Sequence, residues 1–231
     1  MGMMDLATSY GVSVARLGLG LSAVPPAKYP KKKIEIYEFE ACPFCRKVRE
    51  ALTDLDLQVL IYPCPKGGKL YRPAVQERGG RASFPFLVDP NSNIEMYESD
   101  DIIDYLYETY GGRSPSILLR LGPITLLNSQ IASMFRPTRG SRVRPSRRPE
   151  KALELYSFEA SPYCRIVREV LCELELPYLL HNVGKGSPSR EAFVKRSGKM
   201  MVPYLVDPNT GKEMFESDDI RDYLLTTYAD S

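Results

Sequence analysis

An internal repeat constrains the fold of this chain more than any other feature of its sequence. Ile34–Leu57 aligns with Leu153–Leu176 at an offset of 119 residues, with 14 of 24 positions identical. Leu87–Tyr110 aligns with Leu205–Tyr228 at an offset of 118 residues, with 17 of 24 identical. A shared amphipathic pattern would not preserve stretches such as LVDPN and ESDDI in both copies. The sequence therefore predicts two copies of one structural module.

Both copies show the same predicted order of secondary structure. KIEIYEF and ALELYSF are rich in Ile, Leu, Tyr and Phe, which predicts a strand in each copy. Pro43 or Pro162 then opens a helix, since proline is favoured at the first helical position, and Val48, Leu52 and Leu55 follow at helical spacing. Later segments predict a second strand, a short helix, a hairpin and a last helix that begins with Ser-Asp-Asp. The predicted fold is α/β, with the order β-α-β-α-β-β-α and a mixed four-stranded sheet in each copy.

The repeat divides the chain into four segments. We predict module 1 at residues 34–111 and module 2 at residues 152–231. Residues 1–33 form a leader segment with a single acid, Asp5, a bias that suits the remnant of an organelle transit peptide or an ordinary linker. Its sequence faintly resembles the linker segment at residues 112–151, so the repeat also admits a leader helix and a basic tether before each module.

The linker segment has an apolar part and an arginine-rich part. Ser116–Phe135 is largely apolar, which favours one or two helices packed on the modules over a helix on a membrane surface. Arg136–Arg148 lies in a stretch of six arginines without an acid. This stretch is either a solvated linker or a docking patch for an acidic protein, an anionic membrane surface or nucleic acid. The net charge of only +2 argues against a specific nucleic-acid-binding protein.

Cysteine and histidine usage restricts the chemistry. The chain has five cysteines, and an odd number without a secretory signal favours a reducing compartment over a disulfide scaffold. Its single histidine, His181, excludes mechanisms that need several imidazoles. No apolar run is long enough to span a bilayer.

Cys42 and Cys45 form a Cys-x-x-Cys pair between a predicted strand and the start of a helix. The thiolate is the form that attacks a disulfide, and a helix N-terminus stabilises negative charge. Arg46 and Lys47 add positive charge in the first turn, whereas Glu40 would oppose the thiolate if it pointed the same way. We therefore expect Cys42 to be the exposed nucleophile and Cys45 the more buried resolving thiol. A zinc site would need a second close pair of Cys or His residues, so a redox role is favoured over metal binding.

The motifs resemble a known family. The CPFC helix start, the later FP before a strand, and the ESDD start of the last helix are similar to the glutaredoxin branch of the thioredoxin fold. They are more similar still to the N-terminal domain of glutathione S-transferases and of prostaglandin E synthase-like proteins. Two such domains in tandem resemble a plant chloroplast family of glutaredoxin-like proteins. The resemblance covers roughly residues 34–111 and 152–230, about two thirds of the chain.

The resemblance implies a glutathione site in module 1. Pro85, after Phe84, would be a cis-proline facing the active-site thiol, and the backbone beside it would pair with the cysteinyl part of glutathione. Glu98 and Ser99 match the Glu-Ser pair that binds the γ-glutamyl end. The alternative is that Ser99 and Asp100 only cap a helix, and both roles can hold at once. Glutathione is the expected co-substrate or ligand, no metal is expected, and a bridged iron–sulfur cluster is a minor alternative. The linker segment is too short for the helical domain of a complete transferase, so conjugation of hydrophobic substrates is not expected.

Module 2 retains most of this pattern but lacks the nucleophile, because Ser161 stands where Cys42 stands in module 1. Ser161 could activate a bound glutathione thiol, module 2 could bind glutathione without turnover, or it could be a structural partner of module 1. The remaining candidate residues of its glutathione site are Cys164, Val202, Pro203, Glu216 and Ser217. We expect ordinary structural roles for Cys64, Cys172 and His181.

These observations favour a glutathione-linked thiol–disulfide oxidoreductase that acts on protein disulfides or glutathionylated proteins. The alternative is a non-enzymatic module that binds glutathione or an iron–sulfur cluster, or assists assembly, and docks through the basic linker. The resemblance implies a chloroplast location, and a cytoplasmic one is the alternative.

Overall fold

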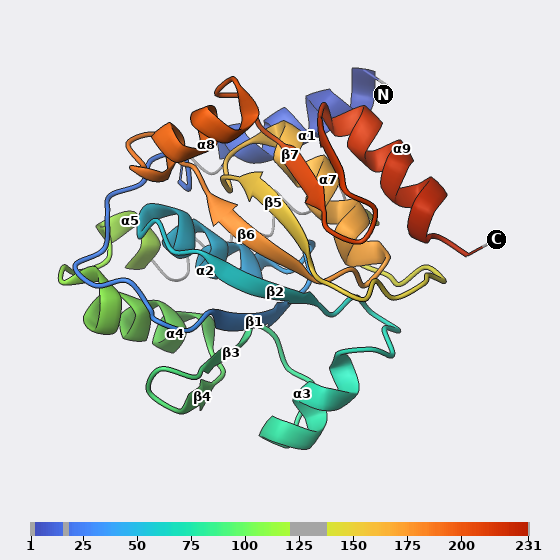
Figure 1. Ribbon diagram of the computed structural model, residues 1–231. Coiled ribbons are helices and arrows are strands. Elements are labelled where there is room, and N and C mark those ends of the chain that lie inside the picture. Colours follow the sequence, from blue (N-terminus) through green and yellow to red (C-terminus); the bar gives the residue numbers. More distant parts are fainter. Residues whose placement is uncertain (1–2, 16–18, 121–137, 231) are drawn as a thin grey trace.

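The computed structural model describes residues 3–15, 19–120 and 138–230, and within them the two modules share one sheet (Figure 1). The strand order is β4-β3-β1-β2-β6-β5-β7-β8. In module 1 the strands are β1 (Ile34–Glu38), β2 (Val59–Pro63), β3 (Phe86–Asp89) and β4 (Ile94–Met96). In module 2 they are β5 (Leu153–Ser157), β6 (Tyr178–Asn182), β7 (Tyr204–Asp207) and β8 (Lys212–Phe215).

The helices confirm the predicted order in both modules. Module 1 contains α2 (Pro43–Asp54), α3 (Arg72–Gly79) and α4 (Ser99–Leu106), which continues as the π-helical turn η1 (Tyr107–Gly111). Module 2 contains α7 (Pro162–Glu173), α8 (Ser189–Ser197) and α9 (Ser217–Tyr228). Outside the modules lie α1 (Met3–Ala15) and α5 (Ile117–Arg120). In each module the first two strands are parallel and the later hairpin is antiparallel, which makes the sheet mixed as predicted.

The core follows from the alternation of side chains along each strand. Residues such as Ile36 and Leu87 point to the face covered by α2, α4, α7 and α9, where one apolar core runs through both modules. Their neighbours Tyr37 and Phe86 point to the opposite face, where a smaller cluster packs under α3. A matching cluster around Phe193 lies under α8.

Strands β2 and β6 join the two modules, a contact that the sequence did not predict. They pair antiparallel, with Leu60 opposite Leu179, and these two residues are equivalent in the repeat. The flanking pairs, Val59 with Leu180 and Ile61 with Tyr178, are likewise exchanged by the repeat. A pseudo-two-fold axis therefore passes between Leu60 and Leu179.

The linker segment is not a solvated tether over the residues that the structure describes. Its backbone lies against both modules: Lys66 N–H donates to Ser141 O at 2.7 Å, and Arg144 N–H donates to Glu173 O at 2.7 Å. The arginine side chains are exposed, but the backbone is fixed because its polar groups pair with those of the modules. The arginine-rich composition predicted the exposure of the side chains and missed the docking of the backbone. Residues 121–137, which include most of the apolar segment Ser116–Phe135 and Arg136, lie outside the described residues.

The leader segment repeats this arrangement on the other module, as its resemblance to the linker suggested. Lys185 N–H donates to Leu21 O, and Ala23 N–H donates to Lys185 O, each at 2.8 Å. We call residues 20–23 of the leader segment and residues 140–144 of the linker segment the two straps, because their backbones are bonded across the modules. Before the leader strap, α1 lies beside α7 (Figure 1), and the Ser9 hydroxyl donates to Pro162 O at 2.7 Å. The leader segment thus contains a helix and a backbone strap, and each module carries the strap from the segment that precedes the other module.

Candidate functional site

Cys42 is the N-cap of α2, and its sulfur accepts a hydrogen bond from Cys45 N–H at 3.5 Å. Pro43 begins the helix, so the chain turns from β1 into α2 directly at the pair of cysteines. Cys42 is 5% exposed and Cys45 is 1% exposed. The expectation of an exposed nucleophile is therefore wrong in degree, because the linker segment covers one side of Cys42. The order is as predicted, with Cys45 the more buried thiol.

The two thiols have opposite pKa shifts. Hydrogen bonding by the Cys45 thiol lowers the pKa of Cys42 against the opposing effect of burial, and backbone groups of Cys45 and Phe44 assist. Burial raises the pKa of Cys45 well above its ordinary value. This difference suits a thiolate nucleophile at Cys42 and a protonated partner at Cys45.

The charges expected to assist Cys42 are engaged elsewhere. Lys47 forms an ion pair with Asp100 in the first turn of α4, and Arg46 lies buried, 3.9 Å from Glu159. Glu40 points away from the thiol, and its carboxylate pairs with Arg168 at 3.1 Å. The stabilisation of the Cys42 thiolate therefore comes from the Cys45 thiol and the backbone at the helix start, not from the cationic side chains predicted for it.

A cis-proline loop faces the nucleophile. The Phe84–Pro85 peptide bond is cis, as the resemblance implied, and the Cys42 sulfur lies 3.9 Å from Phe84 O. The guanidinium of Arg72 lies 4.7 Å from the centre of the Phe84 ring, a cation–π contact that holds this loop against α3. The structure thus brings Phe84, Pro85 and Cys42 together.

Glu98 and Ser99 start α4 in an unusual conformation. Glu98 is the N-cap, with φ 65° and ψ 119°, and makes no side-chain capping bond. Ser99 is the first residue of the helix and is buried, so its hydroxyl is not the cap that the alternative reading expected. A positive φ at a residue other than glycine costs free energy and is concentrated at functional sites. The Lys47–Asp100 ion pair ties this turn to the first turn of α2, which brings the N-termini of the two helices together.

A cavity of about 430 Å³ opens beside Cys42. Module 1 contributes Phe39, Ala41, Cys42, Pro43 and Lys66, and the linker segment contributes Thr138, Ser141 and Arg142. From the sequence these linker residues were expected in a solvated linker or a separate docking patch, and not beside the thiol. The weak resemblance between the leader and linker segments was the sequence signal that could have placed the linker residues beside a module.

Module 2 preserves the frame of the site without the nucleophile. Ser161 is the N-cap of α7, and its hydroxyl accepts from Cys164 N–H at 3.3 Å, as Cys42 does in module 1. The Val202–Pro203 bond is cis, and Glu216 has a φ of 67° before the buried Ser217. The second site is therefore folded like the first, although it lacks a pair of thiols.

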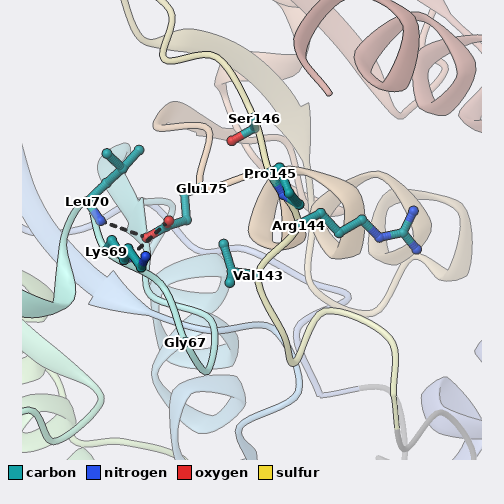
Figure 2. Close-up of a pocket in the computed structure, with 8 residues that line it drawn as sticks. All are labelled: Gly67, Lys69, Leu70, Val143, Arg144, Pro145, Ser146 and Glu175. Carbon is teal, nitrogen blue, oxygen red and sulfur yellow. Dashed lines mark hydrogen bonds between the residues drawn. The ribbon is translucent and has the colours of Figure 1, made fainter. Parts of the chain in front are cut away.

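A second cavity, of about 350 Å³, lies on the other side of the linker segment (Figure 2). Figure 2 shows the Glu175 carboxylate accepting hydrogen bonds from the backbone of Lys69 and Leu70, at 3.2 and 3.1 Å. Val143 lines this cavity, whereas its neighbour Arg142 lines the cavity at Cys42. The linker segment is thus a wall between the two cavities, and only one of them contains a thiol.

The other cysteines and the histidine have structural surroundings. Burial raises the pKa values of Cys64 and Cys172. The His181 ring stacks on Tyr156 with ring centres 4.3 Å apart. Within the described residues, no cluster of three or more His, Cys, Asp or Glu side chains could hold a metal ion, and no helix has the length and apolar character needed to cross a bilayer.

Comparison with protein families identifies the repeat. The family model described as "Glutathione S-transferase, N-terminal domain" matches residues 36–114 and again residues 155–231. The two matches together cover more than half of the chain, and each contains one of the two sites described above.

Similarity to individual proteins is weaker. The Bombyx mori glutathione transferase BmGSTD1 is 24% identical over 37% of this chain and 39% of its own, with a TM-score of 0.32. The Leishmania trimeric glutathione transferase TDR1 is 13% identical over 84% of this chain and 68% of its own, with a TM-score of 0.30. The match thus spans less than half the length of the Bombyx mori protein. No curated protein matches the chain.

Proposed function

The chain belongs to the glutathione S-transferase N-terminal domain family, of which it carries two copies, and from this premise we propose that module 1 is a glutathione-linked thiol–disulfide oxidoreductase. One observation carries the proposal: two thiols at the start of α2 have opposite pKa shifts beside a cis-proline loop. A thiol with a lowered pKa attacks disulfides more readily near neutral pH, because more of it is thiolate.

The proposed reaction uses both cysteines. The Cys42 thiolate attacks the glutathione sulfur of a glutathionylated protein, forms a mixed disulfide with it, and releases the protein thiolate, which takes up a proton. Cys45 loses its proton and attacks Cys42, which releases glutathione as a thiol and leaves a Cys42–Cys45 disulfide. Two glutathione molecules reduce this disulfide and become oxidised glutathione. Cys45 N–H already donates to the Cys42 sulfur, so the two groups are adjacent before the reaction.

The glutathione moiety is proposed to lie between the cis-proline loop and the start of α4. The backbone next to Pro85 pairs with its cysteinyl part, while Glu98 and Ser99 hold its γ-glutamyl end. Two observations support this arrangement: Ser99 is buried at the first position of α4, and Glu98 holds a strained backbone conformation beside it. The N-terminus of α4 favours a carboxylate.

Module 2 is proposed to bind glutathione through Ser161, Val202, Pro203, Glu216 and Ser217 without a two-thiol cycle. The cis Val202–Pro203 bond and the positive φ of Glu216 repeat the frame of module 1 and support this assignment. The tandem arrangement resembles a plant chloroplast family, so we extend the proposal to a chloroplast location. A fluorescently tagged full chain that stayed in the cytosol of leaf cells would contradict the location alone.

The test is reduction of a glutathione mixed disulfide by the purified full chain in the presence of glutathione. Cys42→Ser gives module 1 the serine that module 2 has at the equivalent position, Ser161. We expect the reaction rate with this variant to fall to the rate measured without protein. Cys64→Ser serves as the control, since Cys64 is a buried cysteine of the same module outside the site. Equal rates for the wild type and Cys42→Ser, or no activity in either, would reject the enzyme and leave a binding role.

A further inference from the structure

The cavity beside Cys42 has a cationic wall that the proposed reaction does not use. Lys66 and Arg142 line it, both are exposed, and neither makes an ion pair with any described residue. Other arginines of the linker segment are paired: Arg144 contacts Glu173 at 2.8 Å and Arg147 contacts Asp230 at 3.6 Å. Among the residues that the structure describes, no acidic residue lines the cavity. Two free positive charges therefore share one wall with the nucleophile.

Backbone hydrogen bonds place the two cationic residues next to each other. Lys66 N–H donates to Ser141 O at 2.7 Å, and Val143 N–H donates to Lys66 O at 3.1 Å. These bonds hold residues 66 and 142 side by side as a short parallel bridge. Lys66 and Arg142 thus occupy neighbouring backbone positions, and both line the cavity.

Module 2 lacks one of these two charges at the equivalent place. There Lys185 exchanges the same two backbone bonds with Leu21 and Ala23, so Ser22 occupies the position of Arg142. Module 2, whose strap is less basic, has Ser161 at the position of Cys42. The module that has the nucleophile is therefore the one with the additional cation.

We propose that Lys66 and Arg142 select disulfide substrates that carry a carboxylate, from an Asp or Glu of the target polypeptide, beside the target cysteine whose sulfur leaves. This inference rests on the proposed function and names the substrate class of that same site. Two cations in a partly enclosed cavity attract an anion more strongly than isolated surface charges do, and the attraction weakens as salt is added.

The first experiment requires no enzymatic turnover. Alkylation of Cys42 by iodoacetate, an anion, is compared with alkylation by neutral iodoacetamide, with the modified cysteine identified by mass spectrometry. Arg142→Ser, which copies Ser22 of the other strap, should lower the rate ratio of iodoacetate to iodoacetamide by about threefold, the scale of one exposed charge pair. Arg147→Ser is the matched control, because it removes the same charge from the linker segment outside the cavity. An unchanged ratio in Arg142→Ser would overturn the proposal even if the protein is not an oxidoreductase.

The second experiment identifies the source of the carboxylate. Two peptides glutathionylated at cysteine, one with Glu and one with Gln on each side, differ in flanking charge but not in the glutathione moiety. The wild type should prefer the Glu peptide in kcat/KM, and Arg142→Ser should lose this preference while it still reduces the Gln peptide. Equal losses on both peptides would assign the cations to glutathione and overturn the proposal. An absence of turnover on both peptides, together with a charge-dependent alkylation ratio, would reject the oxidoreductase and the substrate class but retain the anion-attracting wall.

Discussion

At the scale of single residues, the site depends on one thiol acting on another. The largest contribution to the lowered pKa of Cys42 is the hydrogen bond with the Cys45 thiol, and no cationic side chain contributes as much. The sequence located both cysteines and their order of burial. It could not show that Arg46 and Lys47 are held by Glu159 and Asp100, because these partners lie 113 and 53 residues away in the sequence.

A substitution at Cys45 tests this relation. Cys45→Ala removes the donor, so the pKa of Cys42 should rise, and the midpoint of its alkylation by iodoacetamide should move to higher pH. Cys45→Ser retains a hydroxyl donor and should show a smaller upward shift. A midpoint that is the same in Cys45→Ala and the wild type would mean that the backbone at the start of α2 stabilises the thiolate alone.

At the scale of elements, two straps of backbone complete the modules. Gly140 in the linker segment donates to the Glu173 carboxylate at 2.9 Å, and its carbonyl accepts from Ala41 N–H. Gly20 in the leader segment occupies the equivalent place against Ala160. Both glycines have positive φ, and a Cβ on either would lie 2.7 Å from the Cβ of Glu40 or Glu159. Only glycine fits where each strap crosses the loop before an active-site helix.

Gly140→Ala should destabilise the protein in two ways. The positive φ costs about 1–2 kcal/mol for a residue with a Cβ, and the contact with Glu40 forces a buried side chain to move. We expect a loss of about 2–4 kcal/mol in the free energy of unfolding, measured with urea. Gly211→Ala is the matched control, because Gly211 has a φ of +73° but no atom within 4 Å of its added Cβ. Equal losses in the two variants would show that the strap is not closely packed.

The straps also show where sequence reasoning reached its limit. The strands, helices and modules followed from the repeat, because each module satisfies its own apolar pattern. The docking of the linker did not, because Arg139, Arg142, Arg144, Arg147 and Arg148 remain exposed while the backbone between them makes the contacts. Side-chain polarity says nothing about which backbone groups are paired.

At the scale of the whole molecule, buried charges hold the modules together. Arg49 of module 1 donates to the Glu159 carboxylate of module 2 at 2.9 Å, and Arg168 of module 2 contacts Glu40 of module 1 at 3.1 Å. Glu38 also pairs with Arg49, and burial raises the pKa of Glu38 to about 7. Although burial alone would raise the pKa of Glu159, Arg168 and Arg49 lower it to about 2. Arg49 and Glu159 come from opposite modules, as do Arg168 and Glu40, so no single copy of the repeat could reveal these two pairs.

Acid should weaken the buried ion pairs between the two modules. The folded-state pKa of Glu159 is lower than its ordinary value of 4.5, so its contribution to stability is present above pH 4.5 and is lost as the pH falls toward 2. Glu159→Gln should cost about 3–5 kcal/mol at pH 7, because it leaves buried guanidinium groups without their partner. The cost should be smaller at pH 3, as measured by urea unfolding at both pH values. Glu191→Gln is the control: Glu191 pairs with Lys195 on an exposed helix face, and its loss should cost under about 1 kcal/mol. Equal costs of Glu159→Gln at pH 3 and pH 7 would contradict the assignment.

The antiparallel pairing of β2 with β6 has a consequence for the history of the chain. A protein with one module would expose the apolar β2 as a free sheet edge, which a second identical copy could cover through the same self-complementary pairing. Duplication and fusion of such a gene would turn a symmetric dimer into a single polypeptide. Within the fused gene each module has its own coding sequence. A mutation could therefore remove the nucleophile from one module and leave it in the other, which is impossible in a homodimer of identical chains.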